Sequence, residues 1–522
     1  MALASAWPAL LLSVICLLPF LNKAFLIDDS LFLAMAGQIV TSPLHPTNFE
    51  LCWNVVSYCA KAYELAPGNT LMGYTLVPTV LFGAKEWMAH LTQLIFVWVA
   101  VIEISSLVLR MGWSRAHAVA GALLLVAIPP LLPMASTAMP DVLALSVGLV
   151  GIERLAAWRE EGKWHQGAVA ALALGLAGIT RVHLALLIPL GAIFLIGSTN
   201  PREILRQIRQ SLWLWAPVLG GGLVLAAVVL TTRERGLLLS PPANITGLKY
   251  IRANLHSYLL YFCFPLPLAA CSAAAQWTTG RSRVVFTVLA ATTIAWLTRD
   301  RQLIFVLVGG YALADLLWQA WRNRDREGLW LGLWLLVPLP VTYYQQFPIK
   351  YLLPCLPAVI LIWFRLSSAV PVRIARTGAI LVIIGGTVFS LIILRSDAEF
   401  ANFGRDALIT LIRPHTLAGE KVWFPSQFSA YWYASAAGAE LAVPGVREPQ
   451  RGDLFVVGSY ELDKTGMLKK FPNRILVQAL AHKYRFGRTM AAGAGFYYNP
   501  FGNWLWVFRN GDDGRYELWR LN

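Results

Sequence analysis

Long apolar stretches separated by short basic loops make up the chain from its N-terminus to about residue 396. Most of these stretches are about 17–22 residues long, which is the length of α-helix that crosses the hydrocarbon core of a bilayer. We therefore expect a polytopic α-helical membrane protein with about thirteen transmembrane helices. The expected crossings are 6–22, 89–109, 117–135, 139–157, 166–180, 183–197, 212–231, 256–275, 283–298, 302–320, 329–345, 351–366 and 376–395.

The pattern changes after residue 396, where charged residues and turn-forming residues become more frequent. Apolar positions at helical spacing over 400–412 are followed by short runs of β-favouring residues. These runs are KVWF, DLFVV, RILVQ, NWLWVF and YELWRL. The chain is thus predicted to contain a transmembrane domain over 1–396 and a small soluble α/β domain over 397–522.

Basic residues recur on one side of the expected helices, in loops such as 154–163, 202–209 and 322–326. Because cytoplasmic loops of membrane proteins carry an excess of Lys and Arg, that side is predicted to be cytoplasmic. The long loop over 28–88, the loop over 343–350 and the C-terminal domain are then expected to face outward.

The composition supports a membrane protein, since 57% of the 522 residues are hydrophobic and 14% are charged. The net charge of +15 would suggest nucleic acid in a soluble protein. Here basic loops that orient the helices and contact lipid phosphates explain it, and no nucleic-acid partner is expected. Cys52 and Cys59 share the first polar loop and could form a disulfide if it faces an oxidising compartment.

Two adjacent aspartates, Asp28 and Asp29, follow the first apolar segment directly. Carboxylates at a membrane boundary are unfavourable to bury, so a pair there indicates a functional site. One of them could serve as a general base while the other orients it. The alternative is that the pair caps the following short helix, where acidic residues are stabilising.

Other candidate site residues fall on the same predicted outward face. Asp141 follows Pro140 at an expected helix start, where it could instead act only as a cap. Lys350 and Tyr351 stand where an outward loop re-enters the membrane, and Lys350 could be a snorkelling anchor. Arg181 could bind a phosphate, whereas His183 is expected to be a hydrogen-bonded interfacial histidine.

Four stretches together resemble the GT-C glycosyltransferases, in particular the bacterial branch related to dolichyl-phosphate-mannose protein mannosyltransferases and the lipid A aminoarabinose transferase. The stretches are FLIDDSLFLAMAGQI (25–39), STAMPDVLAL (136–145), GLAGITRVHLALLIPL (175–190) and FPIKYLLPCLP (347–357). Some positions depart from that family: Asp29 stands where relatives usually have Glu, Arg181 where they often have Lys, and Lys350 where they commonly have Arg.

The resemblance implies an inverting glycosyltransferase in a bacterial inner membrane. It would move a sugar from a polyprenyl-phosphate carrier to an acceptor hydroxyl on the outer face, with Asp28 as the base. The acceptor could be a lipid, a glycan or a protein. No cofactor or metal site is expected, and dependence on a divalent metal is left open. The other residues assigned to the site are Asp29 and Asp141 as acids, Lys350, Arg181, Arg233 and Arg235 for the phosphate, and Tyr351, His183, Trp53, Tyr343 and Tyr344 for the remaining substrate contacts.

Two other functions fit part of the pattern. A flippase or transporter for lipid-linked sugars would bind the same donor without transferring its sugar. Such proteins tend to place charged residues at the membrane midplane and to show internal repeats, and neither is evident in this sequence. An oligosaccharide ligase, which also uses lipid-linked sugars, is the third possibility.

Overall fold

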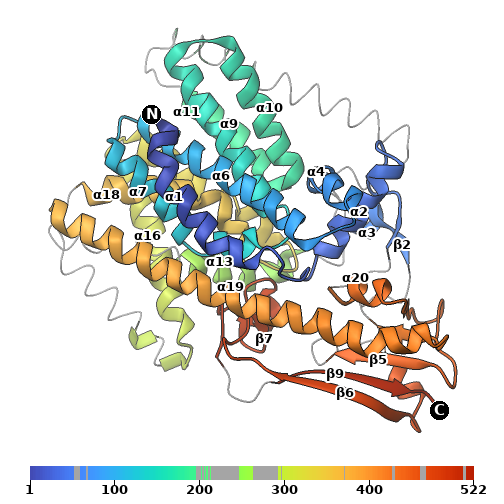
Figure 1. Cartoon of the computed structure of the whole chain (residues 1–522). Helices are drawn as coiled ribbons and strands as arrows, with labels where there is room; N and C mark the ends of the chain where they lie inside the picture. The colour runs from blue at the N-terminus through green and yellow to red at the C-terminus, as the bar shows by residue number, and fades with distance from the viewer. Residues whose placement is uncertain are drawn as a thin grey trace.

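A computed structural model shows a body of helices joined to a small β-sheet by one long helix (Figure 1). It describes residues 1–51, 59–65, 69–195, 246–262, 297–368, 371–425, 429–458, 466–508 and 513–522, with a few positions between 202 and 294. The expected crossing at 212–231, most of 283–298 and the second half of 256–275 lie outside the described residues.

The centre of the helical body is formed by helices from the N-terminal third of the chain. Helix α1 (Ala2–Leu17) packs on α6 (Glu86–Arg110) and α7 (Arg115–Ala127), and α6 also lies along α9 (Asp141–Glu161). Helix α9 pairs closely with α10 (Trp164–Thr180) at Gly151, where an added Cβ would lie 2.6 Å from Leu174. The absence of a side chain at this position therefore permits the contact.

The remaining helices surround this centre or follow it in the chain. Their bounds are η1 Leu18–Phe20, α2 Asp29–Thr41, α3 Ala62–Leu65, α4 Thr70–Thr75, α5 Val77–Leu81, α8 Leu131–Ala135, η2 Val182–Leu186, α11 Leu187–Leu195, α13 Leu248–Phe262, α16 Gln302–Arg322, α17 Arg326–Leu335, η5 Leu339–Tyr343, η6 Ile349–Cys355, α18 Leu356–Ser367, α19 Val372–Leu417, α20 Ser429–Ala436, η7 Met467–Lys470 and η8 Asn499–Phe501.

Five helical segments among the described residues are long and apolar enough to cross a membrane. They are Ala2–Phe20, Glu86–Arg110, Gln302–Arg322, Ile349–Ser367 and Val372–Leu417. Several other expected crossings correspond to shorter helices, such as α7 and the pair η2 and α11. The structure supports an integral membrane protein, while the count of thirteen crossings stays a prediction.

Helix α19 continues without interruption from an apolar half into the polar C-terminal part of the chain. The expected boundary near residue 396 therefore falls inside a helix, and the segment 400–412 is its continuation and not a separate helix. Figure 1 shows α19 running along the helical body and ending over the sheet. The same helix thus contacts both parts of the molecule.

The C-terminal sheet has five strands in the order β4-β3-β5-β9-β6. Strand β3 pairs in parallel with β4 and β5, whereas β9 is antiparallel to both β5 and β6. The strands of this sheet are β3 Val422–Phe424, β4 Glu440–Leu441, β5 Leu454–Gly458, β6 Ile475–Lys483 and β9 Asp513–Arg520. Two separate two-stranded pairs lie elsewhere: β1 Glu50–Leu51 pairs with β2 Ala60–Lys61, and β7 Met490–Ala491 pairs with β8 Ala494–Gly495. The predicted run NWLWVF is not a strand of this sheet and forms only isolated bridges, through Trp504 and Val507.

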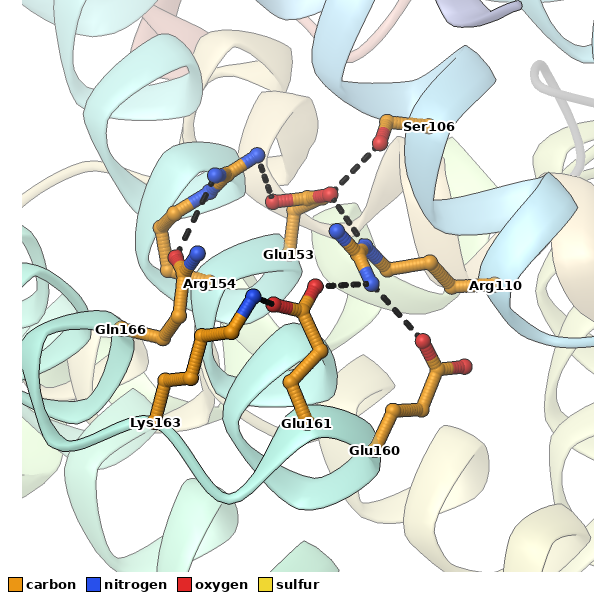
Figure 2. A network of polar contacts seen from close by, with 8 residues as sticks. All are labelled: Ser106, Arg110, Glu153, Arg154, Glu160, Glu161, Lys163 and Gln166. Atoms are coloured by element: carbon orange, nitrogen blue, oxygen red, sulfur yellow. Dashed lines mark hydrogen bonds and ion pairs between the residues drawn. The ribbon is translucent and has the colours of Figure 1, made fainter.

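A network of ion pairs joins the C-terminal ends of α6 and α9 (Figure 2). Arg110 contacts Glu153 and Glu160, each at 2.7 Å, and the fully buried Glu153 also pairs with Arg154. Lys163 joins the same network through Glu161 at 2.9 Å. These basic residues, predicted to lie on the cytoplasmic side, are therefore gathered at one end of the helical body.

The segment between α1 and α2 is attached to the C-terminal part of the chain. The amide of Ala24 donates to Oδ1 of Asn402 in α19 at 2.8 Å, and the amide of Phe25 donates to the hydroxyl of Tyr433 in α20 at 2.7 Å. The Tyr433 hydroxyl donates in turn to Glu86 at the start of α6. The backbone leading to Asp28 is thus fixed by side chains from distant parts of the sequence.

Candidate active site

Asp28 is the residue that precedes the first turn of α2. Its carboxylate makes no capping hydrogen bond to that helix, so it does not perform the structural role that is usual for Asp at this position. About a quarter of the side chain is exposed (25%), and its Oδ2 lies 3.7 Å from Nζ of Lys350. The carboxylate is therefore next to a cation and still accessible.

Lys350 stands in the first turn of η6, with only 4% of its side chain exposed. Its ammonium contacts Asp28 and donates to Sδ of Met139 at 3.7 Å. A thioether is a weak acceptor, and the distance to Asp28 is longer than a hydrogen bond. A buried cation with such weak contacts favours binding of an additional anion. This burial argues against the snorkelling role, in which the charged group would reach water.

Arg181 directly follows the end of α10 and forms a close ion pair with Asp141 in the first turn of α9. The distance from Nη2 to Oδ2 is 2.7 Å, and the Asp141 side chain is 2% exposed. Asp141 therefore orients the guanidinium and is not itself open to a substrate. Nε of Arg181 is buried without a hydrogen-bond partner among the described residues, and the guanidinium carbon lies 5.2 Å from the centre of the Tyr351 ring.

Tyr351 links the cations to an aromatic cluster. Its ring makes edge contacts with His183 at 5.8 Å and with Phe347 at 5.9 Å between ring centres. His183 is buried, and its Nε2 has no hydrogen-bond partner in the part of the chain that the structure describes. The expected hydrogen bond of this histidine stays a prediction. The structure thus brings Asp28, Lys350, Arg181 and Tyr351 into one region, with His183 beside it.

Asp29 lies under this region and is fully buried. Its two carboxylate oxygens accept hydrogen bonds from the amides of Leu26 and Ala138, both at 2.8 Å. Burial raises the pKa of Asp29 from the ordinary value of 3.8 to about 7, and the nearby Lys23 acts against this shift. Asp29 therefore connects the backbone before Asp28 to the turn before α9, and these bonds hold the segment that contains Asp28 in place.

Lys23 was not among the residues singled out from the sequence. Its buried ammonium donates to the carbonyl oxygen and to the hydroxyl of Ser136, each at 2.9 Å. Burial lowers the pKa of Lys23, whereas the nearby carboxylates of Asp397 and Asp29 act against that shift. The only sequence signal was a lone cation between an apolar helix and an acidic pair, and a membrane anchor explains that pattern equally well.

The structure describes only some of the other residues that the sequence predicts for the site. Tyr343 is exposed and Tyr344 is partly buried, in the loop before Lys350. Trp53, Arg233 and Arg235 lie outside the described residues, as does Cys52. Cys59 is disulfide-bonded. Among the residues that the structure describes, no group of three or more His, Cys, Asp or Glu side chains could hold a metal ion.

Comparison with known proteins gives structural neighbours alone. No family model matches the chain, and no curated protein does. The chain is similar in structure to ArnT from Cupriavidus metallidurans. The apo structure of that protein is 13% identical in sequence, with a TM-score of 0.49, and the match covers 91% of this chain and 95% of that one. The structure bound to undecaprenyl phosphate is 13% identical, with a TM-score of 0.48, and the match covers 92% and 97%.

Proposed function

We propose that this chain is an inverting glycosyltransferase that moves a sugar from a polyprenyl-phosphate carrier to an acceptor hydroxyl at the outer face of the membrane. The observation that carries this proposal is the partly exposed, uncapped carboxylate of Asp28 beside the buried ammonium of Lys350. A proton acceptor and a phosphate-binding cation are the two groups that this reaction requires. The sequence resemblance to GT-C glycosyltransferases supports the same assignment.

The chemistry follows from the charges of the site. Lys350 and Arg181 hold the donor phosphate and stabilise the negative charge that grows on it as the bond to the sugar breaks. The acceptor oxygen attacks the anomeric carbon while its proton moves to Asp28. The bond between the anomeric carbon and the phosphate oxygen breaks, polyprenyl phosphate leaves with the electron pair, and the anomeric centre is inverted.

The long separation between Asp28 and Lys350 has a role in this scheme. Because the two groups attract each other without a direct hydrogen bond, a donor phosphate can take over the pairing with Lys350. The carboxylate of Asp28 is then left to accept the proton from the acceptor. Asp141 keeps Arg181 in place during this exchange, since its own ion pair is short and buried.

The deciding experiment follows the donor with purified protein in lipid vesicles. A radiolabelled polyprenyl-monophosphate sugar, supplied with membrane extract as the source of acceptor, should lose its sugar and yield free polyprenyl phosphate. Wild-type protein should catalyse this release and Asp28→Asn should not. Movement of the intact donor between leaflets without release would indicate a flippase, and release only from a pyrophosphate-linked oligosaccharide would indicate a ligase.

A further inference from the structure

The loop that leads into Lys350 is held by a buried asparagine of α13. Nδ2 of Asn254 donates to the carbonyl oxygen of Thr342 at 3.1 Å and also to that of Tyr344. The amide of Gly247, just before α13, donates to the carbonyl of Tyr343 at 2.9 Å. Side-chain and backbone contacts from one region therefore fix the first half of this loop.

The second half of the loop is held by Asn499, which comes from the C-terminal part of the chain. Oδ1 of Asn499 accepts the amide hydrogen of Phe347 at 2.8 Å. Nδ2 of the same side chain donates to Oδ1 of Asn254 at 3.2 Å and to the hydroxyl of Ser257 at 3.0 Å. Asn499 is buried, so it joins the loop to α13 away from competing water.

Phe347 transmits this contact to the site. Its side chain is fully buried, and its ring meets those of Tyr258 at 5.6 Å and Tyr351 at 5.9 Å. Lys350 and Tyr351 follow Phe347 closely, at the start of η6. Fixing the amide of Phe347 therefore fixes both the ring against which Tyr351 packs and the direction in which the backbone approaches Lys350.

We propose that Asn499 is a positioning residue through which the C-terminal part of the chain sets the location of Lys350 and Tyr351. Without Asn499 the amide of Phe347 loses its acceptor inside the protein, and the loop shifts to recover one. A displacement of about 1 Å in a positioned group can lower activity by about 10²-fold. The consequence for donor binding rests on the proposed function, whereas the consequence for the loop does not.

The chain offers a matched control for this proposal in Asn503. Oδ1 of Asn503 accepts from the hydroxyl of Ser257 at 2.8 Å, and its Nδ2 donates to Gln302 at 3.2 Å. Asn503 therefore attaches the same C-terminal segment to α13 and α16; it shares the Ser257 hydroxyl with Asn499, but the amide of Phe347 is bound by Asn499. Asn503→Ala removes only the attachment of the C-terminal segment, whereas Asn499→Ala also removes the hydrogen bond to the loop.

Hydrogen exchange on the full-length protein tests the positioning. We expect the peptide that contains residues 343–350 to exchange about tenfold faster or more in Asn499→Ala, and at the wild-type rate in Asn503→Ala. Asn499→Asp, which keeps an oxygen to accept from Phe347, should exchange more slowly in this peptide than Asn499→Ala. Equal exchange of the peptide in Asn499→Ala and wild-type protein would overturn the proposal, as would equal acceleration by both alanine variants.

Binding of a polyprenyl monophosphate, without a sugar, tests the connection to Lys350. Asn499→Ala should weaken this binding about tenfold, and should weaken it little further in protein that already carries Lys350→Ala, because both changes remove the same contact. If the two substitutions weaken binding of the probe additively, Asn499 affects binding through contacts other than Lys350. If Lys350→Ala alone binds the probe normally, the phosphate assignment in the proposed function is wrong, and the exchange result still decides whether Asn499 positions the loop.

Discussion

The ammonium of Lys350 and the carboxylate of Asp28 lie 3.7 Å apart, with the lysine buried and the aspartate partly open. They are close enough to attract each other and too far apart to share a hydrogen bond. The cation is therefore held by a weak contact and not by a strong one.

Asp28→Asn keeps the size of the side chain and removes its ability to accept a proton. We expect sugar transfer to fall by about 10²-fold or more, which is the scale of a lost general base. Because Asp28 makes no capping bond and its pair with Lys350 is too long for a hydrogen bond, the melting temperature should fall by only a few degrees. Asp406→Asn, at an exposed position of α19, serves as the control and should be fully active. Near-normal transfer by Asp28→Asn would remove this residue from catalysis.

Lys350→Ala should weaken binding of the donor and also slow turnover, because charge on the leaving phosphate grows in the transition state. Lys350→Arg should keep much of the activity, since it preserves the positive charge. Donor KM, kcat and melting temperature measured on the same purified variants separate this role from a structural one. Unchanged KM and kcat in the alanine variant would show that the cation does not contact the donor.

Arg181→Ala should affect stability more than Lys350→Ala does, because it leaves the buried carboxylate of Asp141 without its partner. Breaking a buried ion pair from one side costs about 3–5 kcal/mol. Adding Asp141→Ala to the same protein should restore much of the melting temperature without restoring donor binding. Recovery of donor binding in the double variant would indicate that Arg181 is needed only to neutralise Asp141.

Asp29→Asn is predicted to be a stability variant. The NH2 group of Asn cannot accept a hydrogen bond, whereas both oxygens of Asp29 can in either protonation state, so one backbone amide loses its acceptor and about 1–3 kcal/mol should be lost. The raised pKa of Asp29 means that its favourable contribution is complete below about pH 4 and is lost as the pH rises towards about 7. Thermal unfolding of the variant relative to wild type should therefore differ most at acidic pH. A difference that is constant from about pH 4 to about pH 8 would contradict this.

Glu153→Ala tests the network at the other end of α9. Removing this buried carboxylate takes one ion pair from each of Arg110 and Arg154, and because both guanidinium groups are partly exposed we expect a loss of about 1–3 kcal/mol. Donor KM of the surviving protein should be unchanged, because Glu153 is separated from Asp141 by about 18 Å along α9. Glu160→Ala, which removes a more exposed partner of Arg110, should lose less than about 1 kcal/mol. A changed donor KM in Glu153→Ala would show coupling between the two ends.

Local signals in the sequence predicted part of the site. Pro140 indicates a helix start that places Asp141 in the first turn, and the structure confirms this helix at Asp141–Glu161. The approach of Lys350 to Asp28 was predicted only as a shared face, because pairing between residues so distant in sequence depends on how the helices pack. Met139, which contacts Lys350, and Lys23, which lies near Asp29, gave no distinctive local signal.

The same distinction applies to α19. The rise in polar residues after 396 indicates a change of environment and predicts a boundary between domains, and the helix continues across that position. The chain contains no proline between Val372 and Arg413, so its backbone can continue as one helix while its surroundings change. A change in hydropathy along a helix indicates a change in its surroundings, and it does not by itself indicate that the helix ends.

The attachment of Ala24 to Asn402 joins residues that are 378 positions apart, and that of Phe25 to Tyr433 joins residues 408 apart. At a synthesis rate of about 5–20 residues per second, the first partner is made roughly 20–75 s after Ala24 itself. During this interval the newly made N-terminal segment lacks the bonds that fix its backbone. The region around Asp28 is therefore completed late in biogenesis, so a ribosome that stops before residue 402 leaves a chain in which the N-terminal half of the site is not yet assembled.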